Sequence, residues 1–210
     1  MPQIKYIFRD FWWVVAKLKK DSISYSVQMA SAYKIPKEQL VDFASKPMCE
    51  IRRWDITEHK FWSILSKNIG VDTPKTVKTI FHNPLDSYAK VNKSIIRFVA
   101  KIQKLGYVCI ILSDDNAPQV SILKKAWRYK QFNDIVVSCN VGISKFDDVI
   151  DGTTKIFDYA LKKYKIKATE AIFIDDTEKN CIVAQKAWIK SILAETPSQI
   201  IKEVTKILAI

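Results

Sequence analysis

The chain has 210 residues, 48% of them hydrophobic, which suits one domain with a sizeable core and an inserted subdomain. Its net charge of +12 comes mainly from lysines scattered along the chain, and scattered charge argues against a nucleic-acid partner. We expect a cytoplasmic protein without a membrane segment, because no apolar run could cross a bilayer, residues 1–10 lack signal-peptide features, and the four widely spaced cysteines favour reduced thiols.

The first predicted element is a strand over Ile4–Arg9, a short apolar and aromatic run that ends at Asp10. The long stretch that follows contains no convincing strand and instead predicts helices at Ser22–Tyr33, Lys37–Ala44 and Thr57–Ile69. A helical insertion directly after the first strand indicates a cap rather than a separate domain. The predicted organisation is therefore a helical cap subdomain over residues 14–87 and an α/β core over residues 1–13 and 88–210.

Beyond the insertion, helices and strands alternate along the chain. Short apolar runs predict four more strands, at Tyr107–Leu112, Asp134–Ser138, Ala171–Ile174 and Ile189–Leu193. Amphipathic patterns predict helices at Lys90–Leu105, Gln119–Lys130, Lys155–Tyr164, Asn180–Ala187 and Ser198–Leu208. This alternation predicts right-handed βαβ units and an α/β fold with a doubly wound parallel sheet.

Polar residues follow three of the predicted strands at the point where each strand ends. They are Asp10, Ser113 and the pair Asp175 and Asp176, and Lys145 follows another strand after a short loop. Ligands of open α/β sheets bind beyond the carboxyl ends of the strands, so we expect these side chains to converge. A carboxylate can attack as a nucleophile, paired carboxylates can hold Mg²⁺, and a lysine can bind phosphate oxygens.

Four segments, in their order along the chain, resemble the motifs of the haloacid dehalogenase-like (HAD-like) hydrolase superfamily. They are "IKYIFRDF", "YVCIILSDDN", "VGISK" and "EAIFIDDTEKNCIVAQKAW", and together they span nearly the whole chain. The insertion, with "DITEHKFWSILSKNIG", resembles the small helical cap that this superfamily places between its first two motifs. The resemblance implies a Rossmann-like core with a mobile cap that sets specificity.

The same resemblance implies a role for each residue at the predicted site. Asp10 would be the catalytic nucleophile, while Ser113 and Lys145 would bind the phosphoryl oxygens. Asp10, Asp175 and Asp176 would hold one magnesium ion. The simplest implied function is a magnesium-dependent phosphatase of a small phosphorylated or otherwise anionic substrate, acting as a monomer or homodimer.

Trp12 and Trp13 depart from this pattern. The family's phosphatases carry a second Asp at the first of these positions, usually followed by Gly. The missing carboxyl is a general acid, whose help is worth about 10²–10⁴-fold in rate, so we expect impaired or altered acid–base chemistry. Trp13 also occupies a turn that Gly normally eases. We expect Trp12, Trp13 and Asp114 to contact the substrate.

Three alternatives stay open at this stage. A metal-independent 2-haloacid dehalogenase would tolerate Trp12, because a halide leaves without a proton. A phosphonate hydrolase would need a cap lysine, and Lys17, Lys19 or Lys20 cannot be assigned to that role. A non-catalytic binding protein could keep the fold without turnover. The segment 146–154, longer than the family's pattern, would be a surface loop or would displace Lys145 from the site.

Overall fold

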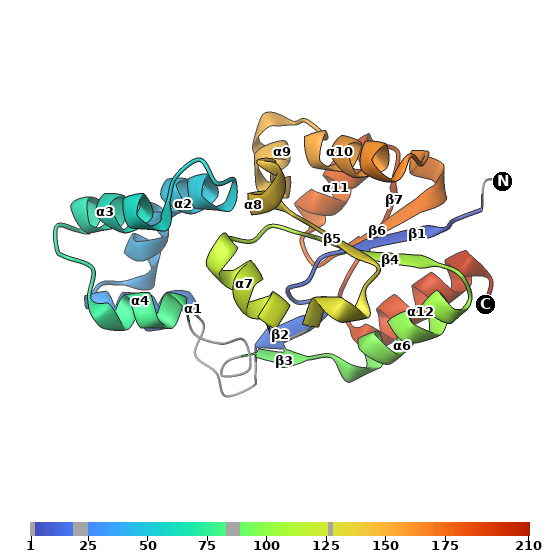
Figure 1. The fold of residues 1–210 in the computed structure, drawn as a ribbon, viewed down its shortest axis with the longest axis horizontal. Helices are drawn as coiled ribbons and strands as arrows, with labels where there is room; N and C mark the ends of the chain where they lie inside the picture. The colour runs from blue at the N-terminus through green and yellow to red at the C-terminus, as the bar shows by residue number, and fades with distance from the viewer. Residues whose placement is uncertain (1–2, 19–24, 83–88, 126–127) are drawn as a thin grey trace.

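The computed structural model describes residues 3–18, 25–82, 89–125 and 128–210. Five parallel strands form its main sheet, in the order β5-β4-β1-β6-β7 (Figure 1). They are β1 (Tyr6–Arg9), β4 (Val108–Ser113), β5 (Asp134–Val137), β6 (Ala171–Asp175) and β7 (Lys190–Leu193). All five predicted strands are present, and the central place of β1 puts Asp10 in the middle of the sheet's carboxyl edge.

Helices cover both faces of this sheet, which confirms the doubly wound prediction. One face carries α6 (Lys93–Lys104), α7 (Ala117–Lys125) and α12 (Pro197–Leu208), and the other carries α10 (Lys155–Tyr164) and α11 (Glu178–Lys186) (Figure 1). Side chains of β1 alternate between the two apolar clusters, with Ile7 in the first and Phe8 in the second. Among the described residues, no helix has both the length and the apolarity needed to cross a membrane.

The shorter elements of the core follow β4 and β5. They are the 3-10 turn at Arg128–Gln131, α8 (Ser138–Val141), α9 (Lys145–Asp151) and the 3-10 turn at Ala168–Glu170. Neither alternative for residues 146–154 is correct, because most of this segment is α9 and Lys145 keeps its ammonium 2.8 Å from Asp10. Asp148 is fully buried there and accepts hydrogen bonds from the backbone N–H groups of Lys155 (3.0 Å) and Ile156 (2.9 Å), so it fixes the start of α10. The extra residues are therefore folded, and Lys145 begins their helix.

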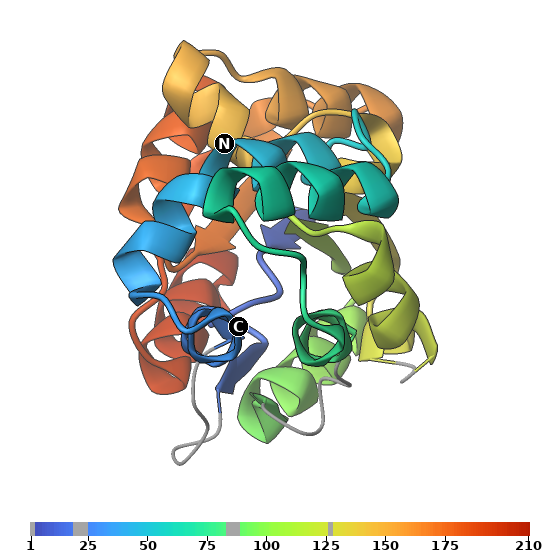
Figure 2. The same cartoon turned by 90° about the vertical axis from the view of Figure 1, so that its left-hand side faces the viewer.

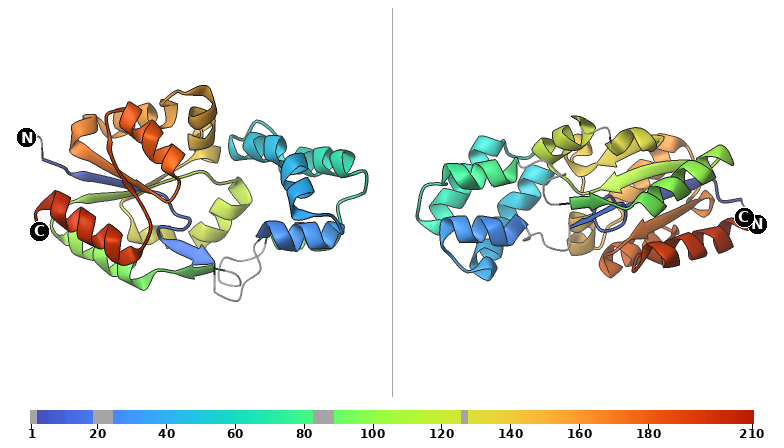
Figure 3. Two further views of the ribbon diagram at one scale, coloured as in Figure 1. Left: turned by 180° about the vertical axis from the view of Figure 1, so that it is seen from behind. Right: turned by 90° about the horizontal axis from the view of Figure 1, so that it is seen from below.

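Among the described residues, four helices form a helical subdomain after the first strand. They are α1 (Tyr25–Tyr33), α2 (Lys37–Arg52), α3 (Glu58–Ile69) and α4 (Lys75–Phe81). The aromatic rings of Phe61, Trp62 and Phe81 pack against one another at its centre, with centroids 4.7–5.6 Å apart. The subdomain lies beyond the carboxyl ends of the strands, at the opposite end of the molecule from the C-terminus (Figures 1 and 3). Seen from that end, α2 and α3 lie across the edge of the sheet (Figure 2).

A side-chain contact joins the subdomain to the core at the end of α2. Arg53 follows the last residue of α2, and its guanidinium forms ion pairs with Asp55 (2.6 Å) and with Asp147 of α9. Asp147 also accepts a hydrogen bond from the hydroxyl of Ser144, the residue that precedes α9. The C-terminal end of α2 is thus attached to the helix that begins with Lys145.

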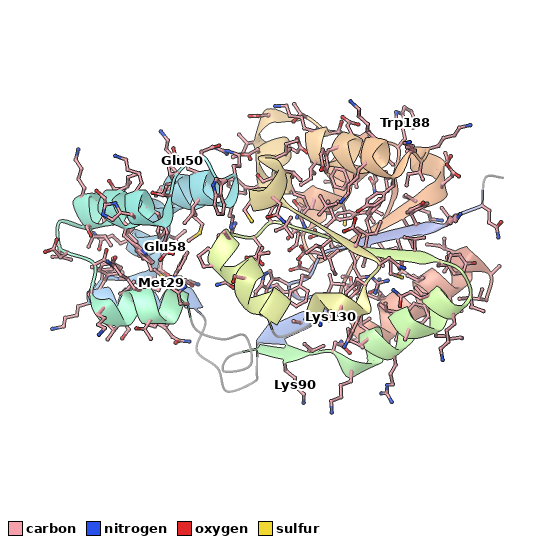
Figure 4. The ribbon with its side chains drawn as sticks, viewed as in Figure 1. Met29, Glu50, Glu58, Lys90, Lys130 and Trp188 are labelled. Atoms are coloured by element: carbon pink, nitrogen blue, oxygen red, sulfur yellow. The ribbon has the colours of Figure 1, made fainter. Side chains whose placement is uncertain are left out.

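A two-stranded antiparallel ribbon was missed by the sequence prediction. It pairs β2 (Ala16–Leu18) with β3 (Ala89–Val91), on either side of the helical subdomain. Both strands are three residues long, and Lys90 of β3 points away from the core into solvent, so no apolar run marks β3 (Figure 4). Val14, Val15 and Ala16 are buried in the core's first apolar cluster, although the prediction placed them in the cap.

Arg9 is the largest fully buried side chain, and it lies on the strand that leads to Asp10. None of its three guanidinium nitrogens has a hydrogen-bond partner among the described residues, and burial lowers the pKa of the group. A buried charge without a partner is destabilising. We therefore expect Arg9→Met, which keeps the length of the side chain and removes the charge, to raise the free energy of unfolding by about 1–3 kcal/mol.

Urea denaturation of both proteins measures this change. Arg97→Met is the matched control, because Arg97 is exposed on α6 and its loss is expected to matter by less than about 0.5 kcal/mol. A less stable Arg9→Met variant would show that a water or an anion satisfies the guanidinium.

Candidate active site

Lys145 lies between two buried carboxylates at the edge of the sheet. Its ammonium nitrogen is 2.8 Å from Oδ1 of Asp10 and 2.6 Å from Oδ2 of Asp175. Asp10 directly follows β1, Asp175 ends β6, and Lys145 begins α9. The side chains of Lys145 and Asp175 are at most 3% exposed and that of Asp10 is 10% exposed. Three of the predicted site residues therefore meet in one buried ion cluster.

The charges of this cluster are set by burial and by one another. Burial, together with the charge of Asp175, raises the pKa of Asp10 to about 6, although Lys145 opposes that rise. Burial disfavours the charged form of Lys145, but Asp10 and Asp175 outweigh it and raise the pKa of the ammonium. Lys145 is therefore a fixed positive charge, and Asp10 is a carboxylate above about pH 6.

Backbone and amide groups hold Asp175 in place. Asn180 of α11 donates to both of its carboxylate oxygens at 3.1 Å, and the N–H of Thr177 donates to Oδ1 at 2.9 Å. Asp176, the next residue, is half-buried and lines the adjoining cavity. Burial and the charge of Asp175 raise the pKa of Asp176.

Ser113 ends β4 and is fully buried. Its hydroxyl forms no hydrogen bond within normal distance to any described residue, but it lies near enough to Asp10 to lower the pKa of that carboxyl slightly. Ser113 is not among the residues that line the cavity. Its predicted role in binding phosphoryl oxygens stays a prediction.

Asp114 connects the loop after β4 to the helix of Lys145. Its two carboxylate oxygens accept hydrogen bonds from the backbone N–H groups of Lys145 (2.9 Å) and Phe146 (3.0 Å). A carboxylate at the first turn of a helix stabilises its unpaired N–H groups. Asp114 also lines the cavity, so it positions α9 and faces the space where a substrate would lie.

A cavity of about 670 Å³ lies between the core and the helical subdomain. Asp10, Lys145 and Asp175 line its core side. Much of the other side is lined by α2, where Leu40, Ala44, Met48 and Arg52 recur every fourth position and Val41 and Ser45 lie beside them. This spacing places the four on one helix face, so the wall is mostly apolar and ends in the cation of Arg52.

Trp12 and Trp13 both line the cavity, as expected for residues near a substrate. The indole N–H of Trp12 donates to Oδ2 of Asp115 at 3.3 Å, and its ring packs edge-on against Phe11. Trp13 is 55% exposed and has a φ of 59°, in the left-handed region that favours glycine. The structure thus contains the turn that the sequence pattern indicated, with a tryptophan in it.

This backbone conformation costs a non-glycine residue about 1–2 kcal/mol. We expect Trp13→Gly to be more stable than Trp13→Ala by about 1 kcal/mol, because both variants lose the indole and only glycine relieves the strain. Thermal and urea denaturation of the two variants measure the difference. The same pair at exposed Ile182, inside α11, should show the opposite order, since alanine is the better helix former.

Sequence reasoning missed two charged residues that line the cavity. Asp115 is buried two positions after Ser113, and Arg52 comes from α2, far away in sequence. Arg52 Nε is buried and has no hydrogen-bond partner among the residues that the structure describes. The "SDDN" segment contains both Asp114 and Asp115, and the sequence alone does not show which of the two has which role. The side chains of Lys17, Lys19 and Lys20 lie outside the described set.

Comparisons with known proteins agree with the fold described above. A family model described as haloacid dehalogenase-like hydrolase matches residues 15–194, most of the chain. The match begins after Asp10, whose place in the site comes from the sheet. Mouse bifunctional epoxide hydrolase 2 is 23% identical over 179 residues, covering 82% of this chain and 30% of that protein. The chain spans less than a third of the length of the curated relatives it matches.

Two solved structures share the fold over nearly the whole chain. One is described as a HAD-like family hydrolase from Porphyromonas gingivalis, with a TM-score of 0.77, 18% identity and 98% of each chain covered. The other is a HAD family enzyme from Bacteroides thetaiotaomicron, solved with magnesium and inorganic phosphate, with a TM-score of 0.67 and 20% identity. This second likeness covers 91% of this chain and 94% of that one.

Proposed function

Because the chain belongs to the haloacid dehalogenase-like hydrolase family, we propose that it is a magnesium-dependent phosphatase of small molecules with Asp10 as its nucleophile. The supporting observation is the ammonium of Lys145 between Asp10 and Asp175 on the core side of the cavity. Lys145 neutralises charge as a phosphate approaches and holds the Asp10 carboxylate in position. Attack of Asp10 on phosphorus would form an aspartyl phosphate, which water then hydrolyses.

The acidic side chains of the site suit magnesium. Asp10 and Asp175 supply carboxylate oxygens, and Mg²⁺ in proteins is held by one or two carboxylates and keeps several waters. Within the described ranges, no three His, Cys, Asp or Glu side chains form a group that could hold a metal. We expect the ion to take carboxylate oxygens of Asp10 and Asp175, with Asp176 acting through water. When bound, it would neutralise charge on the phosphoryl oxygens.

The helical subdomain is proposed to act as the cap of this enzyme. It contributes Leu40, Ala44 and Met48 to the cavity wall, and the core contributes Trp12 and Trp13. These side chains favour a substrate whose body is apolar or aromatic, since burying such a group removes apolar surface from water. Arg52 adds a positive charge for an anionic substituent. Oligomeric state and cytoplasmic location stay predictions.

A substrate panel tests this function. Phosphate esters, a phosphonate and a 2-haloacid are incubated with and without Mg²⁺, and release of phosphate or halide is measured. We expect phosphate release from at least one ester, with loss of activity in EDTA. Chloride release that EDTA does not affect would instead identify a metal-independent dehalogenase. Phosphate binding with no turnover of any ester would identify a binding protein.

A further inference from the structure

Hydrolysis of an alkyl phosphate needs a group that can give and take a proton. An alkoxide is a poor leaving group unless a positioned acid protonates it, and the attacking water then needs a base. Asp10 and Asp175 are paired with Lys145, and Asp114, which is only partly buried, holds the first turn of α9 through the N–H groups of that helix. Two carboxyl groups that line the cavity remain, those of Asp115 and Asp176.

Asp115 and Asp176 differ in how deeply they are buried. Asp176 is only half-buried and follows Asp175 directly, where it can act on a metal through water. Asp115 is 4% exposed, faces the cavity and lies close enough to Asp10 for their charges to interact. A buried carboxyl beside the nucleophile can deliver a proton without competition from bulk water.

We propose that Asp115 is the general acid and base of this enzyme, held toward the cavity by the indole N–H of Trp12. The proposal rests on the phosphatase function above and deepens it. Trp12 lies two residues after Asp10, and its Nε1 donates to Oδ2 of Asp115. The two tryptophans then do not remove acid–base catalysis, because the carboxyl comes from the loop after β4.

The loop that carries Asp115 is fixed on its other side. The backbone N–H of Asp115 donates to the hydroxyl of Ser138 (3.0 Å), which in turn donates to the Asp115 carbonyl (3.1 Å). The N–H of Asn116 donates to Oδ1 at 3.1 Å. Each carboxylate oxygen therefore accepts a hydrogen bond, and the side chain keeps a defined orientation toward the cavity.

The surroundings of Asp115 suit proton transfer near neutral pH. Burial raises its pKa to about 7, and the charge of Arg52 and the Trp12 hydrogen bond limit that rise. The charged groups that face it are Arg52 from α2 and Asp10 from the end of β1. The remaining charged residues of the cavity are Asp114, Lys145, Asp175 and Asp176. An acid with a pKa near the working pH can both donate and accept a proton.

The two chemical steps balance with this one group. In the first, an Asp10 oxygen bonds to phosphorus, the phosphorus–oxygen bond to the leaving group breaks, and the Asp115 proton passes to the departing oxygen. In the second, the Asp115 carboxylate takes a proton from water, and that water's oxygen bonds to phosphorus. The bond to Asp10 then breaks and releases inorganic phosphate. Asp115 ends protonated, as it began.

The test compares Asp115→Asn with the wild type on two substrates, p-nitrophenyl phosphate and an alkyl phosphate. For the alkyl ester we expect kcat/KM to fall about 10²–10⁴-fold, because its leaving group needs the proton. For p-nitrophenyl phosphate, whose nitrophenolate leaving group is stable without a proton, kcat/KM should change less than about tenfold. In the variant the second step lacks its base, so phosphorylated Asp10 should accumulate and be visible by mass spectrometry after an acid quench.

If Asp115→Asn does not fold, a second variant tests the same proposal. Trp12→Phe keeps an aromatic ring and removes the N–H donor that lowers the pKa of Asp115. The alkaline limb of the alkyl-phosphatase pH profile, set by loss of the Asp115 proton, should therefore move to higher pH. Trp12→Asp in the Asp115→Asn background should recover part of the lost alkyl-phosphatase activity.

The outcomes separate this proposal from the function on which it rests. Magnesium-dependent activity that Asp115→Asn leaves intact, or lowers equally on both esters without a phosphorylated intermediate, overturns the role of Asp115 alone. A wild type that hydrolyses no phosphate ester overturns both. The substrate-dependent loss with accumulation of phosphorylated Asp10 supports both.

Discussion

Asp10→Asn is expected to lower kcat/KM for any phosphate ester by at least about 10⁴-fold. Without its nucleophile the enzyme cannot form the covalent intermediate at all, which is more than the loss of one stabilising contact. Removing the nucleophile of a well-studied protease lowers the catalytic rate by about 10⁶-fold. The amide that replaces the carboxylate is a poor nucleophile, although it fills nearly the same volume. Steady-state kinetics with p-nitrophenyl phosphate measure the change, and quench experiments should find no phosphorylated protein.

The fold should survive this substitution, because Lys145 keeps its contact with Asp175. Circular dichroism and the melting temperature check that point. Asp72→Asn, at an exposed site of the helical subdomain, controls for the change of an aspartate to an amide. Mass spectrometry must exclude deamidation back to aspartate. Activity within tenfold of the wild type in a verified Asp10→Asn sample would remove the aspartyl phosphate route.

Lys145→Met is expected to destabilise the protein by about 3–5 kcal/mol at pH 8, in addition to abolishing activity. Removing one partner of a buried ion cluster leaves the other charges uncompensated, which is far more costly than losing a surface ion pair. Here two carboxylates, Asp10 and Asp175, would lose the only ammonium that the structure shows within ion-pair distance of them among the described residues. Urea denaturation at fixed pH measures the loss.

The loss should shrink as pH falls. The pKa of Asp10 is already raised to about 6 in the intact protein, and removal of Lys145 raises it further. A carboxyl with a raised pKa in the folded state binds its proton more tightly there than in the unfolded chain. Lowering pH through that value therefore favours folding, and raising pH through it disfavours folding. At pH 5 the variant should lie measurably nearer to the wild type than at pH 8.

Lys155→Met is the matched control for this experiment. Lys155 is an exposed lysine of the same region, and its ion pair with Asp151 has an N–O distance of 3.7 Å. Exposed pairs contribute about 0–1 kcal/mol, so this variant should stay near the wild type at both pH values. Equal effects of the two substitutions would mean that the charge of Lys145 does not stabilise the site.

Local patterns in the sequence predicted the sheet well. The three central strands β1, β4 and β6 are short apolar runs buried on both faces, and such runs need no tertiary information to be recognised. Asp10, Lys145 and Asp175 could be placed together for the same reason, because parallel strands bring their carboxyl ends to one edge. The three-residue strands β2 and β3 carry lysines and pair only because the helical subdomain brings them together.

Tertiary contacts explain the remaining misses. The α9 segment is longer than the family's pattern, which left a surface loop open, but Asp114 and Ser144 cap its start and Asp148 is fully buried within it. Asp115 and Asp114 are neighbours with the same side chain. One stabilises a helix and the other faces Trp12, a difference that depends on contacts far away in sequence.

The ion pair between Arg53 and Asp147 joins the helical subdomain to α9, so we expect a movement of that subdomain to shift the helix that begins with Lys145. Asp147, the partner of Arg53, lies on α9, and Lys145 at the start of α9 is paired with Asp10. An outward tilt of the helical subdomain would therefore displace α9. In that open form Lys145 would no longer hold the Asp10 carboxylate in position, so Asp10 would react less readily with electrophiles other than the substrate. Faster amide hydrogen exchange in α9 of an Arg53→Gln variant would reveal this linkage, and unchanged exchange would refute it.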